Sequence, residues 1–259
     1  MSQPSLLEHP SILRFLFHPR RETPFDVTND AVVVRFPVDR DLSLGGRLHI
    51  AAPEAPSILF WHGNGEIAAD YDEIGPVYTG MGVNLLVVDY RGYGISDGMP
   101  AGSALLADAV AVYRQVREVL AALGVRDDRL FVMGRSLGSA AALETASHAQ
   151  TEIRGLILES GFAQTIPLLE YLGGVSLTGV GEEAGFGNLG KSARIPVPVL
   201  IIHGQEDQLI LVENAEALFA SVPHPNKRLI TIPHAGHNDL MMFPKLYFEP
   251  IRRFITDHS

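Results

Sequence analysis

Residues 130–141 read L-F-V-M-G-R-S-L-G-S-A-A, a strand-like apolar run followed by G-x-S-x-G at 134–138 and then by small residues that suit a helix. A sharp turn between a strand and a helix lifts the hydroxyl of the central serine, here Ser136, above the end of the sheet. Gly134 and Gly138 suit this turn because it strains the central residue and brings the helix close to neighbouring strands. The pattern therefore predicts that Ser136 is a nucleophile.

A second G-x-S-x-G occurs at 94–98, around Ser96. The strand-like run before it, 85–89, ends too early, and residues 98–102 read Gly-Met-Pro-Ala-Gly, which favours a turn. No helical pattern follows Ser96 directly. The strand, turn and helix criterion therefore favours Ser136 over Ser96.

Apolar runs rich in β-branched residues predict strands at 31–38, 47–51, 57–61, 84–89, 130–133, 155–158, 197–202 and 229–233. From Ser57 onward these runs are nearly continuous in Val, Ile, Leu and Phe, which is typical of strands buried on both faces of a parallel sheet. Helical patterns alternate with them at 67–81, 103–123, 137–148, 212–221 and 239–257. The order predicts an α/β fold with a mostly parallel central sheet and helices on both faces.

Composition narrows the function classes. The chain has 259 residues, 46% of them hydrophobic, so we expect one domain over residues 1–259. Its net charge of −10, without a long Lys/Arg run, argues against nucleic acid or an anionic membrane surface as the main partner. There is no cysteine, which excludes disulfides, thiolate metal sites and cysteine nucleophiles.

The N-terminal apolar patch at 11–17 has no basic start, no long apolar region and no small-residue cleavage site. It predicts a short packing helix rather than an export signal. The chain also has no stretch of about 18 apolar residues that would cross a membrane. A cytoplasmic location is the default expectation.

Residues 161–196 break the alternation of strands and helices after the sixth strand. Glycines there are interleaved with apolar residues, and an irregular stretch of this length in a compact domain is usually functional. We expect a small lid or cap that binds substrate through Phe162, Leu168, Leu169 and Leu172. The alternative is an ordinary surface excursion with one helix near 166–172.

Ser136 needs a general base, and His237 is the best placed histidine. It lies just past the last predicted strand, at the carboxyl end where open α/β sheets place their sites. His234 is an alternative, but it directly follows the strand end and fits an ordinary loop position. With His237 it forms a His-x-x-His spacing, yet no matching Cys or carboxylate cluster accompanies the pair, so we expect no metal.

A histidine base is held in one tautomer by a carboxylate, which also stabilises the imidazolium formed during reaction. Asp207 meets this need because it follows the predicted strand 197–202 and precedes His237 in chain order. Glu206, the neighbouring residue, fits the role of a solvent-exposed charged residue in the loop. Glu159, after the strand at 155–158, is a rival for the orienting role.

Two backbone N–H groups are needed to stabilise the oxyanion of a tetrahedral intermediate. One comes from Leu137, the residue after the nucleophile. The other is expected from the His-Gly-Asn-Gly turn at 62–65, directly after the strand at 57–61, with Asn64 as the first choice and Gly65 as the second. The alternative is that these residues form a tight glycine turn that only connects the strand to the following helix and takes no part in catalysis.

Five short motifs carry a family resemblance: His-Gly-Asn at 62–64, Asp-Tyr-Arg-Gly-Tyr-Gly at 89–94, Gly-Arg-Ser-Leu-Gly at 134–138, His-Gly at 203–204 with Asp207, and Gly-His-Asn-Asp at 236–239. In this order they resemble the serine-hydrolase branch of the α/β-hydrolase superfamily, from about Val32 to the end. The chain looks closest to acyl-protein thioesterases and to monoglyceride-lipase-like and carboxylesterase-like enzymes. The resemblance implies that residues 90–94 shape a loop at the site and take no part in the reaction.

These observations together predict an α/β-hydrolase fold with a short lid and a serine hydrolase that cleaves carboxylic esters or thioesters through an acyl-enzyme. The substrate is expected to be a small molecule with a small to medium apolar acyl group, and no cofactor is expected. An aminoacyl peptidase or amidase and a non-catalytic ligand-binding protein are the alternatives. The sequence leaves the leaving group and the oligomeric state open.

Overall fold

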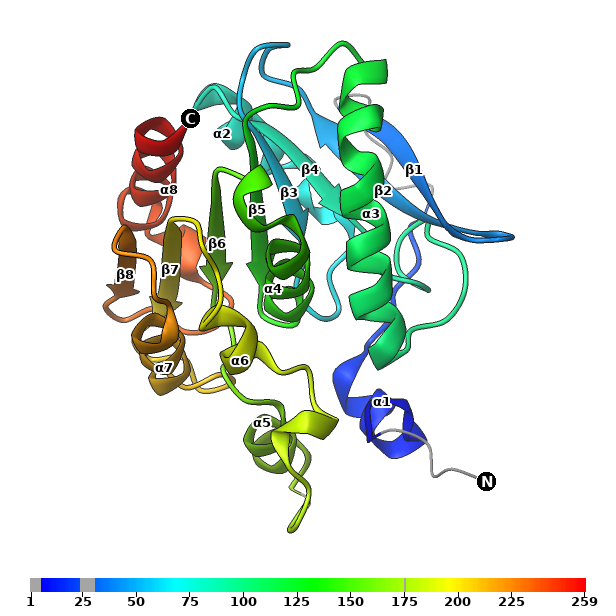
Figure 1. The fold of residues 1–259 in the computed structure, drawn as a ribbon, viewed down its shortest axis with the longest axis vertical. Helices are drawn as coiled ribbons and strands as arrows, with labels where there is room; N and C mark the ends of the chain where they lie inside the picture. Colours follow the sequence, from blue (N-terminus) through cyan, green and yellow to red (C-terminus); the bar gives the residue numbers. More distant parts are fainter. Residues whose placement is uncertain (1–5, 24–30, 175) are drawn as a thin grey trace.

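The computed structural model describes residues 6–23, 31–174 and 176–259. Across these residues the strands are β1 (Val32–Asp39), β2 (Leu42–His49), β3 (Ser57–Trp61), β4 (Asn84–Val88), β5 (Leu130–Arg135), β6 (Gly155–Glu159), β7 (Val199–Gly204) and β8 (Lys227–Ile232). They form one sheet in the order β1-β2-β4-β3-β5-β6-β7-β8 (Figure 1). β3 to β8 are parallel and β2 is antiparallel to both its neighbours. The predicted mostly parallel sheet is confirmed.

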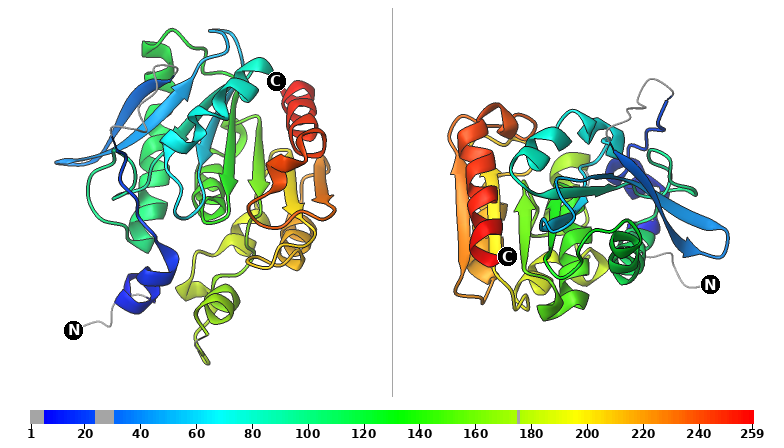
Figure 2. Two further views of the ribbon diagram at one scale, coloured as in Figure 1. Left: turned by 180° about the vertical axis from the view of Figure 1, so that it is seen from behind. Right: turned by 90° about the horizontal axis from the view of Figure 1, so that it is seen from above.

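Helices cover both faces of this sheet, as the right-hand view of Figure 2 shows. The α-helices are α1 (Pro10–Leu16), α2 (Gly75–Gly80), α3 (Gly102–Ala122), α4 (Gly138–Ala149), α5 (Thr165–Gly173), α6 (Asn188–Ser192), α7 (Glu213–Ser221) and α8 (Pro244–His258). Short 3-10 turns include η3 (Ala68–Asp72) and η6 (Leu240–Met242). α3, α4, α6 and α7 pack on one face, and η3, α2 and α8 on the other.

The core is divided by the sheet because side chains alternate along each strand. On β3, Leu59 and Trp61 pack with α3 and α4, whereas Ile58 and Phe60 pack with α2 and α8. All four side chains are fully buried. Burying a side chain of this size stabilises the fold by about 1.5–3 kcal/mol. This two-sided burial explains why the central strands carry almost no polar residues.

Two expectations about local structure were wrong. β2 begins at Leu42, five residues before the predicted start, because Gly45 and Gly46 pair with β1 although they carry no apolar side chain. The helix expected over 67–81 is divided into η3 and α2. Pro76 lies in the first turn of α2, where its missing N–H is tolerated, whereas further inside a helix it would interrupt the hydrogen bonding.

The carboxyl ends of the parallel strands face α1 and α5, which lie side by side at one end of the molecule (Figures 1 and 2). α1 is the short N-terminal helix that the sequence predicted, and α5 belongs to the segment 161–196 that follows β6. Among the described residues, no helix is both long and apolar enough to cross a bilayer. Two segments far apart in the chain therefore cover the end of the sheet where functional groups are expected.

Candidate active site

Ser136 occupies a strained turn between β5 and α4. Its φ is 53°, a left-handed value that is uncommon for a residue other than glycine. The backbone N–H of Ser136 donates to the carbonyl of Glu159 at 2.9 Å, which ties the turn to β6. A Cβ at Gly138 would overlap the carbonyl oxygen of Trp61 on β3. Glycine is therefore required where α4 starts, and the strain at Ser136 is held by its neighbours.

The structure brings Ser136, His237 and Asp207 together. His237 Nε2 lies 2.9 Å from Ser136 Oγ, and His237 Nδ1 lies 2.7 Å from Asp207 Oδ2. Because an ionised carboxylate only accepts hydrogen bonds, Nδ1 carries the proton and Nε2 is free to accept the hydroxyl proton of Ser136. The three side chains come from the ends of β5, β7 and β8.

Asp207 is buried but well satisfied. Its Oδ1 accepts the backbone N–H groups of Leu209 and Ile210, each at 2.9 Å, and His203 Nε2 lies 3.3 Å from Oδ2. Burial alone would raise the pKa of Asp207, but hydrogen bonds from His203 and His237 hold it well below its usual value. Asp207 therefore stays ionised and orients His237 throughout the neutral range.

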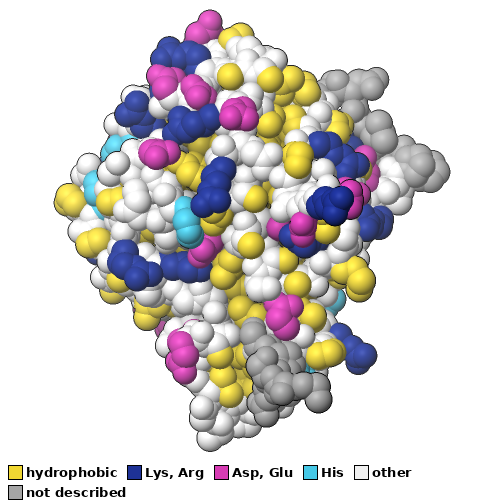
Figure 3. Space-filling model, turned by 45° about the vertical axis from the view of Figure 1, so that its right-hand side comes forward, with side chains coloured by type: hydrophobic (Ala, Val, Ile, Leu, Met, Phe, Trp, Pro, Cys, Tyr) yellow, Lys and Arg dark blue, Asp and Glu magenta, His cyan; other side chains and the backbone are white. Residues whose placement is uncertain are grey.

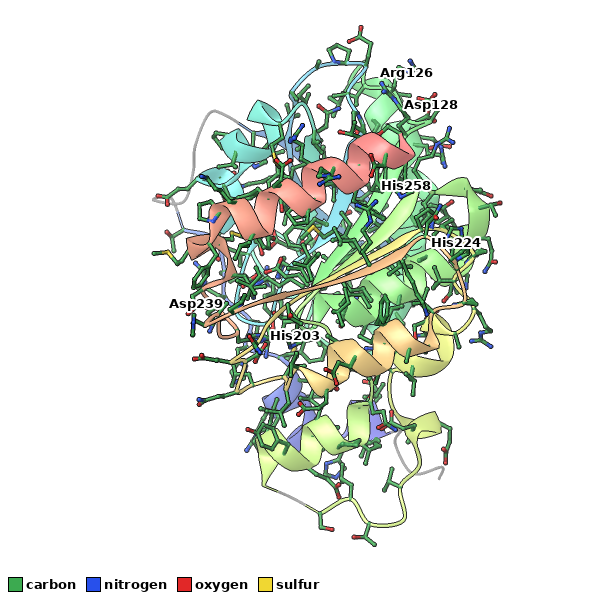
Figure 4. The ribbon with its side chains drawn as sticks, turned by 90° about the vertical axis from the view of Figure 1, so that its left-hand side faces the viewer. Arg126, Asp128, His203, His224, Asp239 and His258 are labelled. Atoms are coloured by element: carbon green, nitrogen blue, oxygen red, sulfur yellow. The ribbon has the colours of Figure 1, made fainter. Side chains whose placement is uncertain are left out.

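Figure 4 shows His203 and Asp239 near the carboxyl ends of β7 and β8, on the side of α5, with His224 and His258 at the opposite end of these strands. Asp239 Oδ1 accepts the backbone N–H of Gly236 at 2.7 Å, which closes the loop that carries His237. Position along the strands thus separates histidines near the site from those far from it.

The alternative residues have other partners. His234 is largely exposed, and its Nδ1 lies 3.0 Å from the carboxylate of Glu206, also exposed. Ser96 is buried, where its hydroxyl donates to the carbonyl of Asp89 at 2.9 Å and accepts the N–H of Gly45 at 2.8 Å. The geometry therefore favours His237 and Ser136 over His234 and Ser96.

Glu159, the rival orienting residue, bonds to groups other than His237. Its carboxylate lies 3.1 Å from Arg135 Nε and accepts the hydroxyl of Tyr247 at 2.7 Å. Burial raises the pKa of Glu159, and the guanidinium of Arg135 opposes this shift. Sequence reasoning did not assign a role to Arg135, which occupies the first x position of the G-x-S-x-G motif, directly before Ser136.

Arg135 joins the nucleophile turn to the histidine loop. Its guanidinium pairs with Glu66 as well as Glu159, and Nη2 donates to the carbonyl of His237 at 3.0 Å and to Asn238 Oδ1 at 2.8 Å. Burial would raise the pKa of Glu66, but Arg135 helps to hold it below its usual value. A long, charged side chain next to a predicted nucleophile was the available signal, but its partners depend on the tertiary fold.

Two backbone N–H groups remain free beside Ser136. Among the described residues, neither the N–H of Leu137 nor that of Asn64 donates a hydrogen bond. The side chain of Asn64, in contrast, has partners at both polar atoms: Oδ1 accepts from the backbone N–H of His18 and the hydroxyl of Tyr93, and one N–H of Nδ2 bonds to His18 Nδ1. The arrangement fits an oxyanion hole made by backbone groups at Asn64 and Leu137.

Ser136 and His237 line an apolar cavity of about 370 Å³. The four residues assigned to the lid, Phe162, Leu168, Leu169 and Leu172, all line it, together with Leu209, Ile210, Phe15, Leu16 and His18. The last three residues come from α1 and the residues after it. Sequence reasoning treated that segment as a packing helix, because its apolar patch carried no sign that it would fold back over the site.

Comparisons with known proteins agree with the fold. A family model described as serine aminopeptidase, S33, matches residues 52–175. The mouse alpha/beta hydrolase domain-containing protein 17C is 31% identical over 236 residues, which cover 88% of this chain and 68% of the mouse protein. Protein 17B of Xenopus tropicalis is 31% identical over 204 residues, covering 77% of this chain and 66% of that protein. The chain spans about two thirds of the length of these relatives.

Solved structures share the fold at lower identity. The esterase Pf2001 from Pyrococcus furiosus superposes with a TM-score of 0.73 at 19% identity, over 93% of this chain and 98% of the esterase. Est1E from Butyrivibrio proteoclasticus, solved with bound ferulic acid, has a TM-score of 0.70 at 19% identity, over 87% of this chain and 98% of Est1E.

Proposed function

This chain belongs to the α/β-hydrolase family, and we propose that it is a serine hydrolase that cleaves esters or thioesters of small to medium apolar acyl groups. One observation carries the proposal. Ser136 Oγ, His237 and Asp207 form a continuous hydrogen-bonded chain, with distances of 2.9 and 2.7 Å, at the wall of the apolar cavity. A hydroxyl next to an oriented imidazole is the arrangement that nucleophilic acyl transfer needs.

The proposed reaction has two steps. His237 Nε2 takes the proton of Ser136 Oγ as the oxygen attacks the acyl carbon, and the N–H groups of Asn64 and Leu137 stabilise the oxyanion. The intermediate collapses to an acyl-enzyme when His237 returns the proton to the leaving alcohol or thiol. In the second step His237 activates water, which releases the acid and restores Ser136.

The cavity disfavours a cationic acyl group. Its described lining includes no Asp or Glu, so the ammonium group of an aminoacyl substrate would find no carboxylate there. Phe15, Leu172 and Leu209 line the cavity and are 40–44% exposed, which gives it an apolar mouth. A neutral acyl chain therefore fits better than an aminoacyl group, although the matching family model is described as an aminopeptidase.

The proposed partner is a small molecule rather than nucleic acid. On the face shown in Figure 3, Lys and Arg side chains are scattered among Asp and Glu side chains. Such a mixture, on a chain of net charge −10, lacks the concentrated positive field that binds a phosphate backbone.

Labelling with a fluorophosphonate probe tests the nucleophile. The native protein should be labelled, Ser136→Ala should not, and Ser96→Ala should be labelled as the native protein is. Turnover of 4-nitrophenyl esters, matched thioesters and aminoacyl amides then tests the substrate class. Preference for the amides would replace the esterase proposal with the peptidase alternative, and no labelling or turnover of any kind would favour a non-catalytic protein.

A further inference from the structure

The residues after α1 are bound to the turn that carries Asn64. The backbone N–H of His18 donates to Asn64 Oδ1 at 2.8 Å, and Asn64 Nδ2 lies 2.8 Å from His18 Nδ1. Asn64 Oδ1 also accepts the hydroxyl of Tyr93 at 2.7 Å. One residue of the N-terminal segment therefore holds both ends of the Asn64 amide.

The orientation of this amide follows from hydrogen-bond chemistry. A backbone N–H and a protonated tyrosine hydroxyl both donate here, so the atom of Asn64 that they share is the oxygen. Burial raises the pKa of Tyr93, which keeps its hydroxyl protonated. The Asn64 NH₂ group must then point at His18 Nδ1, which accepts this hydrogen bond in the tautomer that carries the ring proton on Nε2.

The neighbouring residues extend this attachment. Arg20 forms an ion pair with Asp70, and its carbonyl accepts the backbone N–H of Gly94 at 2.8 Å. Glu22 donates its N–H to the carbonyl of Gly94 at 3.2 Å. The segment 18–22 thus bridges the turn at 62–65 and the loop at 90–97, but within it only His18 lines the cavity beside Ser136.

We propose that His18 is a positioning residue of the active site: by holding the Asn64 side chain it fixes the Asn64 backbone N–H in the oxyanion hole. The inference rests on the proposed function, because it assigns that N–H to the oxyanion. The Asn64 side chain acts here through its bonds to His18 and Tyr93, since Oδ1 accepts from both residues and one N–H of Nδ2 is bound to His18 Nδ1. The role of the Asn64 side chain is structural, because an amide that is bound at both ends limits rotation of the turn next to Ser136.

A structural role alone would have a different signature. The ring of His18 is exposed, so its removal leaves no buried polar group unsatisfied in the core. If His18 only attached the N-terminal segment, its loss would lower stability without a specific effect on kcat. Loss of an interaction that is made only in the transition state lowers kcat and leaves KM nearly unchanged.

Three full-length variants separate these roles. His18→Leu removes the acceptor but keeps a side chain of moderate size, and His18→Asn places an amide oxygen near the position of Nδ1. His9→Leu is the matched control, because His9 is an exposed histidine of the same N-terminal segment that does not line the cavity. The first readout is kcat and KM with a 4-nitrophenyl ester that the native protein turns over.

We expect His18→Leu to lower kcat about tenfold with KM within about twofold. Complete loss of an oxyanion donor costs about 10²–10³ in kcat, and a loosened donor costs a fraction of that. His18→Asn should recover most of kcat, and His9→Leu should match the native protein. Equal kcat for His18→Leu and the native protein, equal losses in the Leu and Asn variants, or a change in KM alone would overturn the proposal.

A second readout does not depend on turnover. Hydrogen exchange of a peptide that spans residues 62–66 is measured in a Ser136→Ala background, where faster exchange is expected with His18→Leu but not with His18→Asn. Failure of the proposed function would show as a native protein that neither turns over esters nor reacts with the fluorophosphonate. Failure of the inference would show as an active native protein with unchanged exchange and kcat in His18→Leu.

Discussion

Replacing Arg135 by Met should destabilise the protein in a pH-dependent way. The substitution removes the guanidinium that neutralises Glu159, which is buried, and Glu66. It also removes the donor to the carbonyl of His237. Breaking a buried ion pair from one side costs about 3–5 kcal/mol, because a charge is left without its partner. For a chain of this size that corresponds to a fall in Tm on the order of 10 °C.

The pH dependence follows from Glu159. Burial already raises its pKa above the ordinary value of 4.5, and loss of Arg135 removes the main opposing charge. Above pH 4.5 the carboxyl group of Glu159 loses its proton in the unfolded chain, whereas the folded variant keeps that proton up to the raised pKa. The folded state then binds more protons, so the stability of Arg135→Met falls as pH rises through this window. The free energy of unfolding of Arg135→Met should therefore lie further below that of the native protein at pH 8 than at pH 5.

Urea unfolding at pH 5 and pH 8, followed by the fluorescence of Trp61, measures this deficit. Trp61 is the single tryptophan and is fully buried. Adding Glu159→Gln to Arg135→Met should recover part of the loss at pH 8, because the amide needs no counter-charge. Arg126→Met is the control, since Arg126 and Asp128 form an exposed ion pair, and solvent screens such pairs so that they add little to stability (Figure 4). Two results together would contradict this explanation: the same loss of unfolding free energy at pH 5 and pH 8, and no gain in unfolding free energy at pH 8 when Glu159→Gln is added.

Three further outcomes are expected. Asp207→Asn should lower kcat about 10⁴-fold by losing control of the His237 tautomer, whereas Glu159→Gln should cost far less in ester turnover; the reverse order would transfer the orienting role to Glu159. Gly138→Ala should yield little folded protein on expression, because its Cβ would overlap the carbonyl of β3, and a native Tm for this variant would contradict the geometry. With native protein, kcat/KM should rise nearly fourfold per methylene, at about 0.8 kcal/mol each, until the cavity is full. Changing Leu168 and Leu169 to Ser should flatten that profile, and identical profiles would place the acyl group elsewhere.

Sequence reasoning succeeded where one physical signal dominates a short stretch. The buried strand at 57–61 was predicted to the residue, because a run of five apolar or small residues between two turns is too short for a helix and suits a strand buried on both faces. The helix at 103–123 was predicted within one residue of α3, because its apolar positions recur with the helical period over a long stretch. β2 was placed poorly because its glycines are required by close packing and strand pairing, which leave no local pattern.

The candidate site shows the same division. Ser136, Asp207 and His237 each follow a predicted strand, and parallel strands end at one edge of a sheet, so their proximity followed from the strand order alone. The order of residues along the chain also preferred Asp207 to Glu159 as the partner of His237. Their separations of 2.9 and 2.7 Å, and the binding of Glu159 to Arg135 instead, required the folded structure.

By itself the sequence predicted an α/β fold with a mostly parallel sheet, the strand edge that carries the candidate site and the three side chains expected there, because hydrophobic periodicity and turn chemistry act over a few neighbouring residues. The α/β-hydrolase fold was implied by the resemblance of its motifs to that family. Only the tertiary structure decided that α1 returns over the sheet to line the cavity, that His18 holds Asn64 and that Arg135 joins Glu159 to the His237 loop. The last two contacts join residues 46 and 102 positions apart. Such contacts are selected by packing of the whole chain, which no local pattern of residues encodes.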